Sequence, residues 1–397
     1  MIVKGVSLQR MAGKVRAQAI LEFEGTTRFK HGEKAATLWF EWPENYFNPG
    51  SIGIEPFVLV SLTLAMGVGE NITLEEDIDP IFYLNLLEAI DIYHSFFPEE
   101  TSVIGIHARC KNKSYSASER VGSFFSGGID SLFNVADLKK MNALSGVHKV
   151  TDLWLVQGMD IPLNDNEFFQ STYDRLTEMA SIEGLNVIPL KTNARELQDG
   201  LVKWTTLGFG VILGAIAKIF SDAVSTVLIG SFEQYKKCMP NASAPLIDPM
   251  WSCSKQTVRH YSARYSRIDK IKVIADYAPG LLSQARVCWK NTSGSYNCGC
   301  CEKCLRTLSE LRLANASHLV NSFPEGDVIK LISGFRLEDS EIAGEFAVNY
   351  WRQIHAVAAA QGDQALKSAV EPVLQYASSR GKVIRLKKMV RAFIRRS

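Results

Sequence analysis

The sequence has 397 residues, 46% of them hydrophobic, which allows two or three domains with a large core and excludes a disordered chain. The last sixteen residues, Lys382 to Ser397, hold seven basic residues and no acidic one. Without them the formal net charge of +2 becomes −5, so the body of the chain has no overall charge that favours nucleic acid.

Residues 1–118 are expected to form a separate N-terminal α+β domain. Polar and apolar residues alternate in Ala19 to Glu24 and in Thr37 to Trp42, which predicts two strands. Phe57 to Ala65 is nearly all apolar, and Pro80 to Phe97 has apolar residues at helical spacing. Two helices should therefore follow the strands.

A short turn, Ser126 to Ser131 with the sequence SGGIDS, is predicted to join a buried strand to a helix. Arg120 to Phe125 supplies the strand, and apolar residues at helical spacing follow from Leu132 to Leu138. The turn thus lies at a helix N-terminus, where unpaired N–H groups favour an anion. The paired glycines let a phosphate approach the backbone, and the two serine hydroxyls add donors. A phosphate site is predicted, against the alternative of a glycine-rich turn without a ligand.

Asp130 is the unusual member of this turn, because a carboxylate repels a phosphate unless a cation lies between them. Mg²⁺ prefers oxygen ligands and is the predicted cation. The stretch from Phe124 to Ser131 resembles the SGGxDS signature of the PP-loop ATP pyrophosphatases, also called adenine nucleotide alpha hydrolases. The resemblance implies cleavage of ATP between its α and β phosphates, with Asp130 and Ser131 as catalytic residues. It also implies that the nucleotide is bound by the whole turn: Ser126, Gly127, Gly128, Ile129, Asp130 and Ser131.

No GxxxxGK[ST] loop occurs in the chain, which argues against ordinary γ-phosphate hydrolysis.

Strand and helix patterns alternate from Arg120 onwards, which predicts an α/β fold with a doubly wound, mostly parallel sheet. Ligands of such sheets bind beyond the C-terminal ends of the strands. Gly158 and Gly230 each follow a later strand, so both are assigned to the ATP site. The irregular segment Phe232 to Gln256 is predicted to be a lid or substrate clamp. Candidate substrate contacts, each weighed against a structural role, are Gln157, Asp160, Glu233, Lys255, His260 and Arg264.

Four cysteines lie at the end of a last predicted strand, Gln284 to Trp289, and after it, with the spacing C-x9-C-x2-C-x2-C: Cys288, Cys298, Cys301 and Cys304. CxxC units present two thiolates to one ion, and four thiolates complete the tetrahedron that Zn²⁺ prefers. A structural Zn²⁺ that clips this segment onto the nucleotide domain is predicted, with free thiols or an iron–sulfur cluster as alternatives. Cys300 is surplus and could replace Cys298 as a ligand.

The SGGxDS turn followed about 160 residues later by this cysteine series resembles the 7-cyano-7-deazaguanine synthase family over residues 119–315. In that family ATP adenylates a carboxylate, ammonia displaces AMP, the amide is dehydrated to a nitrile, and zinc is structural. The resemblance implies a PP-loop ATP-binding domain with a zinc site made of the four cysteines. Residues 1–118 and a helical C-terminal extension, residues 316–397, have no counterpart in typical members. The chain is therefore interpreted as an enlarged relative whose substrate is open.

The leading hypothesis is an ATP-dependent carbon–nitrogen ligase that forms AMP and pyrophosphate and joins ammonia or an amine to a small carboxylate. One alternative is the same adenylation applied to a macromolecule, by conjugation to a protein amine, for example in antiviral defence, or by tRNA modification. tRNA thiolation is disfavoured because no cysteine lies between Cys110 and Cys238. A second alternative is a nucleotide-binding scaffold without turnover, against which the intact Asp130 speaks.

The expected location is the cytoplasm, because the N-terminus lacks the pattern of a secretory signal and no apolar run is long enough to span a bilayer. A protein acceptor and a homodimer are left open as partners. The basic tail is expected to be a solvated helix or to touch anionic lipid or RNA. Its apolar residues fall on one side: Leu386, Met389, Val390, Phe393 and Ile394.

Overall fold

The structure is a computed structural model that describes residues 1–112, 118–290 and 295–396. The chain forms two compact units, Met1–Ser266 and Arg267–Ser397, called unit 1 and unit 2 below. The predicted boundaries after residues 118 and 315 do not coincide with this division.

The described residues of unit 1 form a ten-stranded sheet in the order β10-β9-β6-β7-β8-β3-β2-β1-β4-β5. The strands are β1 Ile2–Met11, β2 Lys14–Glu22, β3 Ala35–Pro43, β4 Ile72–Leu74, β5 Ile106–His107, β6 Val121–Phe124, β7 Asp152–Gln157, β8 Val187–Thr192, β9 Thr226–Gly230 and β10 Thr257–Tyr261. Strands β6 to β10 are all parallel, which confirms the prediction of an α/β fold with a mostly parallel sheet.

The N-terminal strands extend this same sheet. β1, β2 and β3 form an antiparallel meander, and β3 then pairs antiparallel with β8. Side chains reinforce this short junction, because the Thr192 hydroxyl donates to the Trp39 carbonyl (2.8 Å) and the Trp39 N–H donates to Asn193 Oδ1 (2.9 Å). Residues 1–118 were expected to be a separate domain, but their strands and the strands of residues 119–266 belong to one hydrogen-bonded sheet.

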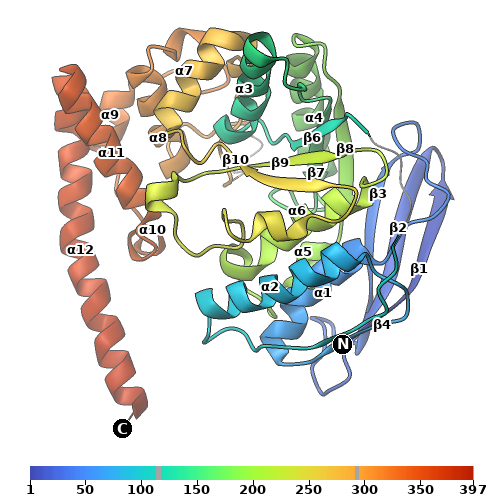
Figure 1. Cartoon of the computed structure of the whole chain (residues 1–397). Coiled ribbons are helices and arrows are strands. Elements are labelled where there is room, and N and C mark those ends of the chain that lie inside the picture. Colours follow the sequence, from blue (N-terminus) through green and yellow to red (C-terminus); the bar gives the residue numbers. More distant parts are fainter. Residues whose placement is uncertain (113–117, 291–294, 397) are drawn as a thin grey trace. The chain divides into compact units, whose positions relative to one another are not determined.

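Helices cover both faces of the parallel strands, with α3 and α4 on one side and α6 with α1 on the other (Figure 1). The helices of unit 1 are α1 Glu55–Val68, α2 Pro80–Phe96, α3 Ile129–Ser145, α4 Asn166–Ser181, α5 Ala194–Gln198 and α6 Phe209–Ile219, with the π-helical turn η1 Trp204–Gly208 and the 3-10 turns η2 Tyr235–Lys237 and η3 Asp248–Trp251. The core between the sheet and α6 is aromatic: the Phe220 ring lies 5.1 Å from Trp154 and 5.6 Å from Trp42. The sheet is therefore doubly wound, as predicted.

β10 lies in a mostly polar stretch for which no strand was predicted. Its position at the sheet edge explains the polarity, since Thr257 and Arg259 are exposed while Val258 is buried. Polar residues on an edge strand hide the apolar pattern from which a strand is usually predicted.

The described part of unit 2 is helical and contains no strand. Its helices are α7 Arg267–Tyr277, α8 Glu302–Leu313, α9 Val328–Ser333, α10 Asp339–Ala343, α11 Phe346–Gln361 and α12 Gln364–Arg396, with the 3-10 turns η4 Pro279–Leu282 and η6 Ser317–Leu319. Trp351 of α11 and Leu366, Val370 and Val373 of α12 are fully buried in its core.

The predicted strand Gln284 to Trp289 is wrong, because this segment is irregular. The buried side chain of Asn297 takes the place of a neighbouring strand. Its Oδ1 accepts from the N–H groups of Val287 (2.9 Å) and Cys288 (3.2 Å), and its Nδ2 donates to the Ala285 carbonyl (2.8 Å). A single amide side chain thus satisfies the backbone groups that a sheet would have paired.

Candidate functional site

The turn Ser126 to Ser131 lies where the parallel sheet changes direction. From β6 the chain proceeds to β7 and β8 on one side and then returns to β9 and β10 on the other. In open parallel sheets ligands bind beyond the carboxyl ends of the strands at such a switch point. The sequence predicted that the turn follows a strand, and the strand order places it at the switch point.

The backbone of the turn requires a glycine at position 127. Gly127 has φ of 79°, which side-chain-bearing residues rarely adopt, and Gly128 is the extended residue that precedes α3. The Ser131 hydroxyl donates to the Gly128 carbonyl (2.8 Å), and the Ser131 N–H donates to the same oxygen (3.0 Å). The Ser131 proton therefore closes the turn, whereas the sequence prediction had it facing a phosphate.

The turn has other potential donors. Ser126 is exposed at the start of the turn. Ile129 and Asp130 are the first two residues of α3, and N–H groups in a first helical turn have no acceptor within the helix. Such a helix start carries partial positive charge, so it attracts anionic groups.

The end of β9, at Gly230, lies against the turn. A Cβ atom at Gly230 would be 3.0 Å from the backbone oxygen of Asp130 and 3.4 Å from Asn134 Nδ2. Asn134 is fully buried in α3 and donates to Ser123 Oγ on β6 (3.1 Å). These contacts hold the first turn of α3 between β6 and β9.

Gly158, also assigned to the ATP site, has a packing reason to be glycine. Its φ is 95°, and a Cβ atom would lie only 1.9 Å from the Thr192 carbonyl oxygen. Its neighbour Gln157 is buried, and Nε2 donates to the carbonyls of Pro162 and Leu163 (both 3.1 Å). These residues shape the loop after β7, and their contact with a ligand stays a prediction.

Asp137 anchors α3, although the sequence analysis did not single it out. Its buried carboxylate accepts from the hydroxyls of Tyr261 (2.8 Å) and Tyr265 (3.4 Å), at and just beyond the end of β10. Burial raises the pKa of Tyr261, and the nearby Asp137 charge acts in the same direction. Tyr261 is therefore a protonated donor at neutral pH, and it fixes α3 against the C-terminal edge of the sheet.

His260 is held by Asp248, with Nδ1 2.7 Å from Oδ2, and both side chains are almost completely buried. The Ser243 hydroxyl donates to the same oxygen (2.7 Å). Burial raises the pKa of Asp248, and the hydrogen bond from His260 opposes that shift. Trp251, three residues after Asp248, is fully buried. The second half of the predicted lid is thus core structure that supports β10.

The remaining candidate contacts have different local environments. Lys255 forms an ion pair with Asp222, and the guanidinium of Arg264 stacks over the Tyr265 ring at 4.6 Å. Burial raises the pKa of Glu233, whose Oε2 accepts from the Met239 N–H (3.1 Å). The other candidate, Asp160, is exposed.

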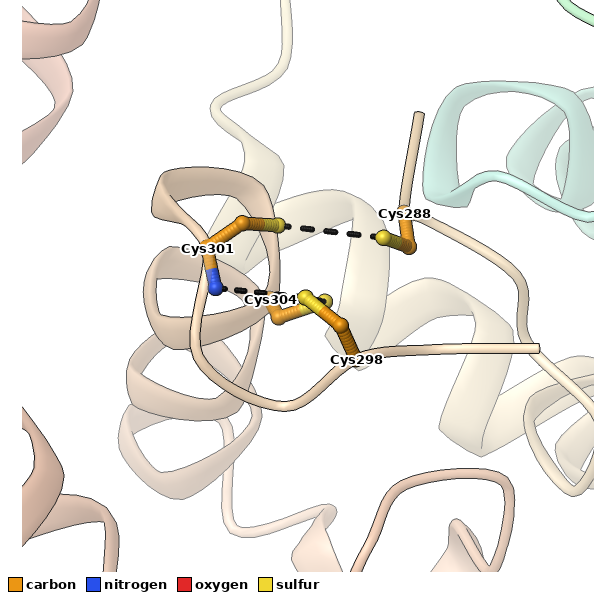
Figure 2. A group of neighbouring side chains, drawn as sticks. All are labelled: Cys288, Cys298, Cys301 and Cys304. Carbon is orange, nitrogen blue, oxygen red and sulfur yellow. Dashed lines mark hydrogen bonds between the residues drawn. The ribbon is translucent and has the colours of Figure 1, made fainter. Parts of the chain in front are cut away.

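The four predicted metal ligands come together in unit 2, with their sulfur atoms facing one another (Figure 2). The Sγ atoms of Cys288 and Cys301 are 3.9 Å apart, those of Cys298 and Cys304 are 3.8 Å apart, and all four lie within 4.8 Å of one another. A tetrahedral zinc site with Zn–S bonds of about 2.3 Å has sulfur–sulfur edges of about 3.8 Å. The cluster therefore has the size and chemistry to hold a metal ion such as Zn²⁺.

The backbone between the cysteines brings the thiols close together. Gly299 has φ of 72° and turns the chain between Cys298 and Cys301, whose N–H donates to Cys298 Sγ (3.3 Å). The hydrogen bond with Cys301 lowers the pKa of Cys288, and the neighbouring Cys288 sulfur raises the pKa of Cys304. A divalent cation would stabilise all four as thiolates.

Cys300 is exposed and lies outside the cluster, so Cys298 is the residue that completes the set. Arg306, two residues after Cys304, forms an ion pair with Glu302 (2.9 Å) and lies over the Tyr350 ring. All four cysteines belong to unit 2, so a metal here would join the segment held by Asn297 to the start of α8.

In comparisons with protein-family models, curated proteins and solved structures, nothing matches this chain. None of the helices in the described ranges is both long and apolar enough to cross a bilayer.

Proposed function

We propose that this chain is an ATP-dependent, AMP-forming ligase of the PP-loop type that activates a carboxylate for attack by ammonia or an amine. The observation that carries the proposal is the SGGIDS turn at the start of α3, at the switch point between β6 and β9. An anion-binding turn and a metal-binding carboxylate then occupy the position where parallel sheets bind nucleotides.

The residues of the turn have distinct roles in this proposal. The Ser126 hydroxyl and the first N–H groups of α3 would bind the β and γ phosphates of ATP. Asp130 would hold Mg²⁺, which when bound offsets the negative charge of the departing pyrophosphate. The Ser131 hydroxyl, which donates to the Gly128 carbonyl, maintains the shape of the turn.

Rigid placement of these donors supports the proposed chemistry. A carboxylate is a poor electrophile because its oxygen is a poor leaving group. When that oxygen is bonded to the α-phosphate of ATP, the leaving group becomes AMP. Donors that already point at the developing charge stabilise it without reorganisation. The Asn134–Ser123 and Asp137–Tyr261 hydrogen bonds supply that rigidity by fixing α3 to β6 and β10.

The direct test is the product of ATP cleavage. The chain is incubated with ATP, Mg²⁺, ammonia and a panel of small carboxylates, and AMP and ADP are separated by chromatography. We expect AMP and pyrophosphate to accumulate only with a suitable carboxylate, and α,β-methylene ATP to give no AMP. ADP with phosphate as the sole products would contradict the proposal.

Gly230→Ala tests the contact between β9 and the turn. The new Cβ would be 3.0 Å from the Asp130 backbone oxygen, so the turn must shift by a few tenths of an ångström. We expect the KM for ATP in AMP formation to rise about fivefold, because small misplacements of binding groups weaken catalysis. The melting temperature should fall by no more than about 3 °C.

Gly50→Ala is the matched control, since Gly50 is exposed and a Cβ there would meet nothing within 4 Å. Equal KM values for the two variants would show that the Gly230 contact does not position the nucleotide.

A further inference from the structure

The last part of α12 differs from the rest of unit 2 because its apolar residues are exposed. The first part of the helix packs on α9, α10 and α11 and buries residues such as Val373 and Ala377. Beyond Gly381 the helix continues past α10 (Figure 1). Ile384 is half-buried against the core of unit 2. The other four described apolar side chains of this extension have large exposed fractions: Val383 42%, Leu386 61%, Met389 69% and Val390 50%.

These exposed side chains form one stripe along the helix. Val383, Leu386 and Val390 are spaced i, i+3 and i+7, and Met389 is three residues after Leu386, so all four share a face. Single exposed apolar residues are common on protein surfaces, but a continuous stripe marks a surface that is covered by something else.

Positive charge surrounds this stripe. Residues 382–397 hold seven Lys and Arg residues and no acidic residue. At 100° per residue, the exposed Arg385 and Lys387 flank the stripe on opposite sides. Arg385 is 4.0 Å from Glu345, and both side chains are largely exposed, so solvent and salt weaken that ion pair.

We propose that this end of α12, called the basic stripe (residues 382–390), lies on the surface of an anionic lipid bilayer. An apolar face flanked by Lys and Arg is the pattern of a helix that rests in the headgroup region, with its apolar side chains among the acyl chains. The anionic headgroups supply the opposite charge. The helix would rest on the bilayer rather than cross it, consistent with the absence of a spanning helix in the described residues.

Two other occupants fit the basic stripe less well. Pairing with the same helix of a second copy would bring two sets of seven positive charges together without acidic partners. RNA would satisfy the positive charges through its phosphates but would leave the apolar stripe exposed. Lipid satisfies both features, and the inference does not depend on the proposed ligase activity.

The test is co-sedimentation of the full-length protein with vesicles of phosphatidylcholine alone or mixed with phosphatidylserine. We expect binding at least about 10-fold stronger to the anionic vesicles, weakened by added salt. The variant Leu386→Asn with Val390→Asn should lose about 10-fold of that binding, because it removes the centre of the stripe. Both residues are exposed, so the fold should not change.

Leu144→Asn is the control, since Leu144 is equally exposed but lies at the end of α3 in unit 1. Equal binding to both vesicle types, binding to neither, or undiminished anionic binding by the Leu386→Asn and Val390→Asn variant would overturn the proposal. The proposal would also be overturned if the protein were a dimer that the Leu386→Asn and Val390→Asn variant dissociates. Binding of polyuridylate through residues 382–397, without binding to vesicles, would overturn it as well.

Discussion

The Asp130→Asn variant is expected to lose ATP-dependent AMP formation by about 100- to 1,000-fold while keeping its fold. Asparagine has the same shape as aspartate but no negative charge, so the turn would keep its backbone and lose its proposed cation ligand. Phosphate and protein would then face each other without a bridging ion. The rate of AMP formation at saturating ATP, measured over a range of Mg²⁺ concentrations, checks this expectation.

Glu167→Gln is the matched control for this variant. Glu167 is exposed and occupies the first turn of α4, the helix that follows the neighbouring parallel strand β7. Like Asp130, Glu167 is the second residue of its helix, but it does not lie at the switch point of the sheet. AMP formation within about threefold of the parent is expected for Glu167→Gln. The same modest loss in Asp130→Asn would remove Asp130 from the proposed site.

Local sequence patterns were sufficient to predict the central features of unit 1. A buried strand, a small-residue turn and an apolar helical face stand next to one another between Arg120 and Leu138, so β6, the turn and α3 follow from neighbouring residues alone. The spacing of Cys298, Cys301 and Cys304 likewise fixes three ligands within one turn and the start of a helix.

The features that were not predicted depend on side-chain hydrogen bonds that no local pattern indicates. Asp137 meets Tyr261 across 124 residues, and no local pattern links an acidic residue of one helix to a tyrosine that follows so much later. The side chain of Asn297 imitates a strand beside Cys288, so an apolar run that normally indicates a strand stays irregular. In each case a side-chain hydrogen bond decides the structure.

Replacing Cys301 and Cys304 together by serine is expected to have the largest effect on stability. The parent should contain about one zinc ion per chain, and the double variant close to none, because two of four ligands are lost. Structural zinc sites contribute roughly 10 kcal/mol or more to folding in small domains, so unit 2 should lose much of its stability. Elemental analysis and thermal unfolding measure the two effects.

Two single variants make this prediction specific. Cys300→Ser removes the exposed thiol that lies between the ligands, so it should keep both the metal and the melting temperature. Cys298→Ser removes a sulfur that lies 3.8 Å from Cys304 and should lose most of the metal. Loss of zinc from Cys300→Ser with retention in Cys298→Ser would reassign the fourth ligand. If the parent contains no metal and the double variant has the same melting temperature, the thiols pack in unit 2 without an ion. A site of four thiolates stabilises the fold only when the cation is bound.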